Sequence, residues 1–254
     1  MRIPPDGRMY MLGMSRIAWE KGMRSLAMIP GTHNYAKEWA KDLRQAWEAY
    51  GGTIVAHEPA NYYGKTDFYP YLTKVVQTNP DLLFLCGPSA VTANIIRQSR
   101  ELGFKGRYLV CEQAKLGEME KQVGLSGLNG AIGLCPMTQY HQFPWDVTAS
   151  WRQEYQKSFK YLPNLEAANH YQMLIGFLRA MESADTIDDL DAIMNALKTV
   201  YPGSPGEPMY MLGVTRQVVV NSGYAISIEN SRYTKPQWIG ISVLPEGYYS
   251  LPGK

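Results

Sequence analysis

The fold is decided by residues 24–56, which read RSLAMIPGTHNYAKEWAKDLRQAWEAYGGTIVA and contain one complete strand–helix–strand unit. Residues 24–30 are a short apolar run that ends in a proline, which is typical of a buried strand. Apolar side chains then recur every three or four residues from Ala36 to Tyr50, which predicts an amphipathic helix ending at Gly51. Residues 53–56 predict a second strand, so the unit is β–α–β.

The same alternation continues along the chain. Apolar runs begin at about residues 24, 53, 82, 107 and 131, which gives a period of 24 to 29 residues. Helical patterns fill the intervals from Thr66, from Ser89 as the expected N-cap, and over 115–123. This period predicts an α/β fold with a parallel, Rossmann-like sheet of strand order 2-1-3-4-5 and helices on both faces.

After Pro136 the pattern changes. Three helical patterns follow one another around Trp151, Tyr171 and Leu190, and apolar runs at 218–220, 224–228 and 238–241 then predict antiparallel strands. The sequence therefore predicts an α/β lobe over 8–136, a helical stretch that belongs to another part of the protein over 137–206, and a returning β segment over 207–254.

Composition excludes several function classes. The 254 residues carry a net charge of only +2, without a Lys/Arg block, so we expect no nucleic-acid partner. Three cysteines exclude a fully paired disulfide framework, and no metal-ligand spacing occurs, so we expect no metal. Phosphate-loop, dinucleotide-loop and nucleophile-elbow motifs are missing, so we expect neither a cofactor nor an enzyme. Residues 1–7 contain no apolar signal segment.

A binding site is expected where the strand order reverses, at the carboxyl ends of the parallel strands. The loops at this edge contribute the Tyr35 phenol, helix amides near Ser89 and the Glu112 carboxylate, which suit a small polar ligand. Each residue also has a simpler interpretation: Tyr35 as a surface residue at a helix start, Ser89 as an N-cap alone, and Glu112 as a solvated acid. His33 is interpreted as an exposed loop residue.

Six motifs occur in the order of a known family, the leucine/isoleucine/valine-binding branch of the periplasmic substrate-binding proteins of ABC transporters. The motifs are 25–30 with Asn34-Tyr35, Tyr50–Val55, Lys65–Phe68, Asn79–Leu82, Arg97-Gln98 with Glu101–Gly103, and 169–185. These motifs lie between residues 25 and 185, and the match in order extends over roughly residues 8–230, so the chain resembles that family over most of its length.

The resemblance implies a type I periplasmic-binding fold and a set of ligand-binding residues. Tyr35 and Glu112 match the family's tyrosine after the first strand and its glutamate after the fourth, which accepts the ligand's ammonium. Pro88 stands where the family has an aromatic residue. The expected ligand-binding set is therefore Asn34, Tyr35, Pro88, Ser89 and Glu112.

The family chain is longer at its N-terminus, and about its first third has no counterpart here. We therefore expect an incomplete second lobe, a truncated product and self-association through that lobe. The resemblance implies a periplasmic protein that captures an amino acid-like ligand for an ABC importer and meets its permease subunits. Two alternatives stay open: a ligand-sensing regulatory domain of the same fold and, less favoured, an enzyme on a doubly wound sheet.

Overall fold

The computed structural model describes residues 7–111, 113–134, 146–163, 165–197, 209–212, 217–220, 224–235 and 237–238. The chain divides into two compact units. The first, called here the α/β unit, comprises Gly7–Cys135 and Tyr224–Lys254, and the second, called here the helical unit, comprises Met1–Asp6 and Pro136–Gly223. The division into functional parts expected from the sequence stays a prediction.

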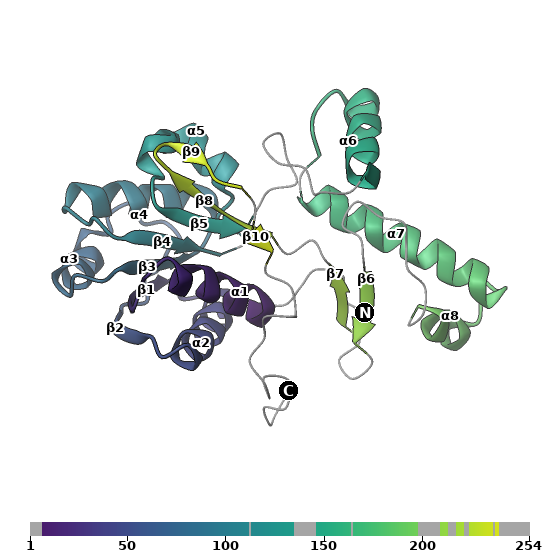
Figure 1. Ribbon diagram of the computed structural model, residues 1–254, viewed down its shortest axis with the longest axis horizontal. Coiled ribbons are helices and arrows are strands. Elements are labelled where there is room, and N and C mark those ends of the chain that lie inside the picture. Colours follow the sequence, from purple (N-terminus) through teal and green to yellow (C-terminus); the bar gives the residue numbers. More distant parts are fainter. Residues whose placement is uncertain are drawn as a thin grey trace. The chain divides into compact units, whose positions relative to one another are not determined.

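Helices and strands alternate through the first part of the α/β unit (Figure 1). They are α1 (Gly7–Glu20), β1 (Ser25–Pro30), α2 (Asn34–Ala49), β2 (Thr53–His57), α3 (Tyr69–Gln77), β3 (Leu82–Cys86), α4 (Ser89–Glu101), β4 (Arg107–Val110), α5 (Leu116–Gly127) and β5 (Ala131–Leu134). The C-terminal residues of the unit add β8 (Tyr224–Glu229), β9 (Arg232–Tyr233) and β10 (Gln237–Trp238).

The sheet has the predicted strand order. Its described strands run β10-β8-β5-β4-β3-β1-β2, with β9 paired to β8, so the first five strands have the order 2-1-3-4-5. All pairs among these five are parallel. The strand β8 returns antiparallel to β5, as the C-terminal apolar runs predict. Helices α1 and α2 cover one face and α3, α4 and α5 cover the other (Figure 1).

The central strands are buried on both faces, which explains their unbroken apolar sequences. Every residue of β3 is fully buried. On α2, the inward face consists mainly of apolar side chains such as Trp39, Leu43 and Trp47, at the spacing that the sequence predicts. The indole Nε1 of Trp47 donates to the Thr53 carbonyl oxygen at 3.2 Å, which fastens the end of α2 to the start of β2.

The boundaries of α3 and α5 differ from the sequence prediction. The helix expected from Thr66 begins at Tyr69 instead, because the segment before it bonds to α4: Gln98 Nε2 donates to the Thr66 carbonyl at 2.6 Å, and the Phe68 amide donates to Gln98 Oε1 at 2.8 Å. The helix expected over 115–123 extends to Gly127 across a kink at Gly124, whose φ of 67° suits glycine.

The helical unit contains α6 (Asp146–Phe159), α7 (Leu165–Ala184), α8 (Leu190–Ala196) and an antiparallel pair, β6 (Met209–Leu212) and β7 (Gln217–Val220). Helices α7 and α8 pack through a small core of Ala180, Ile193 and Leu197. Another face of α7 is largely open: Tyr171, Leu174 and Leu178, at helical spacing, are 39%, 56% and 52% exposed, and the Tyr171 ring lies 5.5 Å from that of Trp151 in α6.

Asp81 holds the amino ends of β1 and β3 together. Its Oδ2 accepts from the amides of Arg24 and Ser25 and from the Ser25 hydroxyl, each at 2.9 Å. Partial burial raises the pKa of Asp81, but the hydrogen bonds together lower it by more, so the pKa lies below its ordinary value of 3.8. The ionised carboxylate therefore stabilises the folded protein fully at pH values above 3.8. This stabilisation is lost as pH falls through the lowered folded-state pKa.

Asp81→Asn is expected to lower the free energy of unfolding at pH 7 by about 1 kcal/mol, a value reduced by solvent screening at this exposed site. The difference from wild type should begin to shrink as pH falls below 3.8 and should vanish below the lowered folded-state pKa, where the wild-type carboxyl is neutral in the folded protein too. Urea unfolding at pH 7 and pH 3 measures both. Asp188→Asn is the control, because that carboxylate accepts no hydrogen bond within the described residues and should change neither value. A pH-independent effect of Asp81→Asn contradicts the assignment.

Candidate functional site

Three loops meet at the carboxyl edge of the α/β unit because the parallel strands before them end level with one another. Pro30 at the end of β1 pairs with Cys86 at the end of β3, and Leu85 pairs with Val110 of β4. Gly31, the first residue of the loop after β1, forms a parallel β-bridge with Ala60 in the loop after β2. The strand order predicts a ligand site at this edge.

His33 caps the helix that follows β1. It is the N-cap of α2, and its Nδ1 accepts from the Ala36 amide at 3.2 Å. A neutral imidazole that accepts at Nδ1 carries its proton on Nε2. That Nε2 is buried and has no hydrogen-bond partner within the described residues. The interpretation of His33 as an exposed loop residue is therefore wrong, because the side chain is half-buried and bonded to the Ala36 amide of α2.

An aromatic row runs from this loop into the unit. The ring centroids of Tyr63 and His33 are 5.9 Å apart, those of His33 and Tyr35 6.1 Å, and those of Tyr35 and Trp39 5.6 Å. Tyr10 of α1 stacks on Trp39 at 5.7 Å. Trp39 and Tyr10 are buried, Tyr35 is half-buried and Tyr63 is exposed. One end of the row therefore exposes ring surface at the sheet edge, and the other end packs in the core.

Tyr62 packs against the first residue of the loop after β3. Its hydroxyl donates to the Ile29 carbonyl of β1, and burial raises its pKa well above the ordinary value, so the phenol stays a donor. Its ring lies against Gly87, where an added Cβ would come within 2.1 Å of the Tyr62 ring. The glycine is required by this close approach.

Ser89 is a junction between three segments. Its hydroxyl is 2.6 Å from Glu118 Oε2 and 3.1 Å from the Gln113 carbonyl, and it accepts from the Lys115 amide at 3.0 Å. The prediction that Ser89 is an N-cap is wrong. Pro88 is the cap residue of α4, with extended backbone (φ −58°, ψ 150°), and Ser89 is the first helical residue. The buried hydroxyl instead ties the loop after β4 and the start of α5 to α4.

The structure brings Asn34, Tyr35, Pro88 and Ser89 to one edge. Asn34 is exposed at the first position of α2, and Pro88 is half-buried. Glu112 lies outside the described residues; Cys111 and Gln113 on either side of it are at this edge. The ligand-binding roles of all five stay predictions. Sequence reasoning missed Tyr63, His33 as a cap, and Glu118 as the partner of Ser89.

Within the residues that the structure describes, no group of three or more His, Cys, Asp or Glu residues could hold a metal ion. Within the same residues, none of the helices has the length and apolar character needed to cross a membrane.

Comparisons with known proteins agree with this arrangement. A family model described as periplasmic binding protein matches residues 4–231. A leucine-binding protein from Thermotoga maritima is 19% identical, with a TM-score of 0.78 over 93% of this chain and 67% of its own. A periplasmic ligand-binding protein of a branched-chain amino acid ABC transporter from Burkholderia xenovorans is 17% identical, with a TM-score of 0.78 over 94% of this chain and 64% of its own.

A solute-binding protein of an ABC transporter from Rhodopseudomonas palustris, in complex with 3,4-dihydroxybenzoic acid, is 18% identical, with a TM-score of 0.73 over 91% of this chain and 64% of its own. The chain thus spans about two thirds of the length of these structures. At such identities the likeness is one of fold.

Gly87→Ala is expected to destabilise the protein by about 1–3 kcal/mol, because the new methyl group overlaps the buried Tyr62 ring. Gly117→Ala is the matched control. Gly117 lies in α5 with open space where a Cβ would stand, so alanine there should be neutral or stabilise by up to about 1 kcal/mol. Urea unfolding compares the two variants, and equal effects would show that Gly87 is not required by close packing.

Proposed function

The chain belongs to the periplasmic binding protein family, and on that basis we propose that it captures a small amino acid-like carboxylate for an ABC importer. The observation that carries the proposal is the aromatic row whose half-buried Tyr35 lies at the carboxyl edge, the same edge at which β3 and β4 end. The family is one of solute binders rather than enzymes, and its membership implies an extracytoplasmic location. We place the protein in the periplasm, with permease subunits as its partners.

The similar structures support a carboxylate ligand. One is named as a leucine-binding protein, one as a ligand-binding protein of a branched-chain amino acid transporter, and one holds 3,4-dihydroxybenzoic acid. Each of these molecules has a carboxylate and an apolar part, the isobutyl group of leucine or the benzene ring of dihydroxybenzoic acid; leucine alone has an ammonium, and the acid alone has two phenolic hydroxyls. A phenol and stacked rings at the mouth of the site suit the apolar body of either ligand.

Glu112 decides between these two ligand classes in our proposal. By the family resemblance, Glu112 accepts a hydrogen bond from the ligand's ammonium. The carbonyl of its neighbour Gln113 accepts from the Ser89 hydroxyl of α4. An enclosed carboxylate and ammonium form a charge-assisted hydrogen bond of about 1.5–3 kcal/mol. An amino acid would gain this interaction, whereas a ligand without an amine would bring no partner for the carboxylate.

Glu112→Gln is expected to weaken amino-acid binding by roughly tenfold to a thousandfold, because the ligand's ammonium would be enclosed without its charged partner. Tyr35→Ala should weaken binding of amino acids and of their 2-hydroxy analogues alike, through lost ring contact. Calorimetric titration with leucine, phenylalanine, their 2-hydroxy analogues and 3,4-dihydroxybenzoate measures these effects. Glu48→Gln, the same change at an exposed residue of α2, should leave every affinity unchanged.

Two results would contradict the proposal. Amino-acid affinity unchanged in Glu112→Gln removes the ammonium role and favours a ligand without an amine. Failure of the folded wild-type protein to bind any compound of the panel contradicts capture of a small carboxylate.

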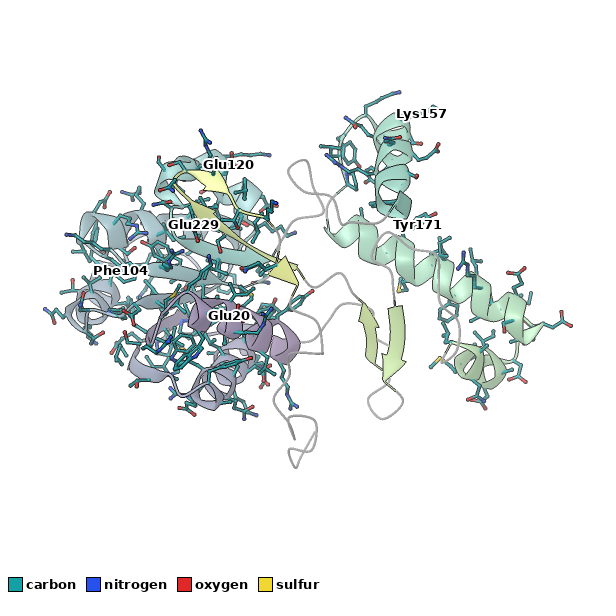
Figure 2. All side chains as sticks on the ribbon, viewed as in Figure 1. Glu20, Phe104, Glu120, Lys157, Tyr171 and Glu229 are labelled. Atoms are coloured by element: carbon teal, nitrogen blue, oxygen red, sulfur yellow. The ribbon has the colours of Figure 1, made fainter. Side chains whose placement is uncertain are left out.

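We also propose that a second copy of the chain covers the open face of α7. Tyr171, labelled in Figure 2, lies on that face with Leu174 and Leu178, whereas the α7 residues that face α8 are already packed. Three large exposed apolar side chains in one stripe are unfavourable in water, and pairing two such stripes would remove them from solvent.

Self-association should therefore rise with concentration and weaken when the stripe becomes charged. Leu174→Glu is expected to shift the protein toward monomer in multi-angle light scattering, because a carboxylate on the stripe would have to be desolvated on pairing. Ser158→Glu adds the same charge at an exposed position of α6 and should have no effect. A wild-type protein that stays monomeric at all concentrations would contradict the pairing.

A further inference from the structure

A pocket lies at the amino edge of the sheet, opposite the proposed ligand site. It measures about 500 Å³, within the range of small-molecule sites. Its walls come from the end of α4, the start of β4, the turn before β5 and the end of β8. Phe104 and Glu229, both labelled in Figure 2, border it. Nothing in the proposed capture of a ligand uses this pocket.

Arg100 is fixed in the pocket wall. Its Nη1 donates to the carbonyls of Phe104 and Gly106 at 2.6 and 3.0 Å, and its Nη2 donates to the Asn129 carbonyl at 2.7 Å. The guanidinium also lies over the Tyr108 ring, 4.5 Å from its centroid. Carbonyls and a ring orient this cation but do not neutralise it, and no carboxylate within the described residues pairs with it.

The remaining charges of the lining add to this excess. Arg107 Nη1 pairs with Glu229 Oε1 at 3.0 Å, and Lys21, just outside the lining, pairs with the same oxygen at 2.6 Å. Lys105 is exposed at the pocket and has no ion-pair partner in the described part of the chain. Three cations and one carboxylate line the pocket, so it carries two net positive charges, and Glu229 is already shared between two cations.

Neutral donors complete the lining. Ser126, Asn129 and Asn230 also line the pocket, and their side chains carry one hydroxyl and two amide groups. Guanidinium and ammonium groups with hydroxyl and amide donors are the groups that bind a tetrahedral dianion, whose several oxygens accept in different directions. A single carboxylate would neutralise only half of the excess charge. We propose that this pocket binds a phosphate group, either inorganic phosphate or a small phosphate monoester.

The test is a titration of the ¹⁵N-labelled chain with inorganic phosphate at pH 8 and constant ionic strength, followed by backbone amide shifts. We expect saturable shifts at Gly106, Arg107, Gly130 and Asn230, with half-saturation on the order of 1 mM or tighter. Glycerol phosphate is the second probe. Tighter binding of glycerol phosphate would assign a monoester, and equal or weaker binding would assign inorganic phosphate; either result supports a phosphate site.

Lys105→Gln should weaken phosphate binding about tenfold, because it removes one charge-assisted contact. This variant should fold normally, since Lys105 makes no ion pair within the described residues. Arg107→Gln should have a similar effect on phosphate, although it also breaks the pair with Glu229. Lys41→Gln removes a charge from an exposed position of α2 and should leave the affinity unchanged.

Three results would overturn the proposal: shifts that do not saturate, shifts that sodium chloride reproduces at equal ionic strength, and equal affinities in Lys105→Gln and Lys41→Gln. Each result would show that phosphate is attracted only by non-specific electrostatics and not by a defined site.

Discussion

The parallel pairing of β1 with β3 is the constraint on which the rest of the structure depends. Leu26 to Pro30 pair residue by residue with Leu82 to Cys86, and nearly all of these side chains are buried. A shift by one residue would exchange the two faces of each strand and expose different side chains to each helix layer. The register also makes the strands end level, so that the loops carrying Tyr35 and Ser89 meet at one edge. Asp81 sets this register at the other end by joining β3 to the first residues of β1.

The two edges of this sheet have different chemistry. The carboxyl edge presents rings and hydroxyl groups and, by our proposal, binds the transported ligand. The amino edge carries Arg100, Lys105 and Arg107 around a pocket with a single carboxylate. Because the sheet separates the edges, a ligand at one need not compete with an anion at the other. The two proposals therefore stand independently.

Periodicity in the sequence predicts the five parallel strands and their order, and the structure confirms both. Local patterns fail where distant residues compete for the backbone. Thr66 is not helical because Gln98 binds its carbonyl, and the Ser89 hydroxyl bonds Glu118 rather than capping α4. The tetrapeptide Met-Tyr-Met-Leu is helical at 9–12 and a strand at 209–212, so its surroundings decide its conformation. In the site, Tyr35 and Ser89 follow from the strand ends, whereas the ring contacts of His33 and Tyr63 depend on folding of the loop after β2 and could not be predicted.

Hydrogen–deuterium exchange with and without ligand tests the central claim most directly, namely that ligand binds at the carboxyl edge of the α/β unit. The ligand is the tightest-binding compound of the calorimetric panel. We predict slower exchange in peptides that cover 31–37, 61–64, 87–92 and 113–118, and unchanged exchange over 104–107 and 129–131 at the amino edge. Protection confined to the amino edge, or found in neither set of peptides at saturating ligand, would contradict the account.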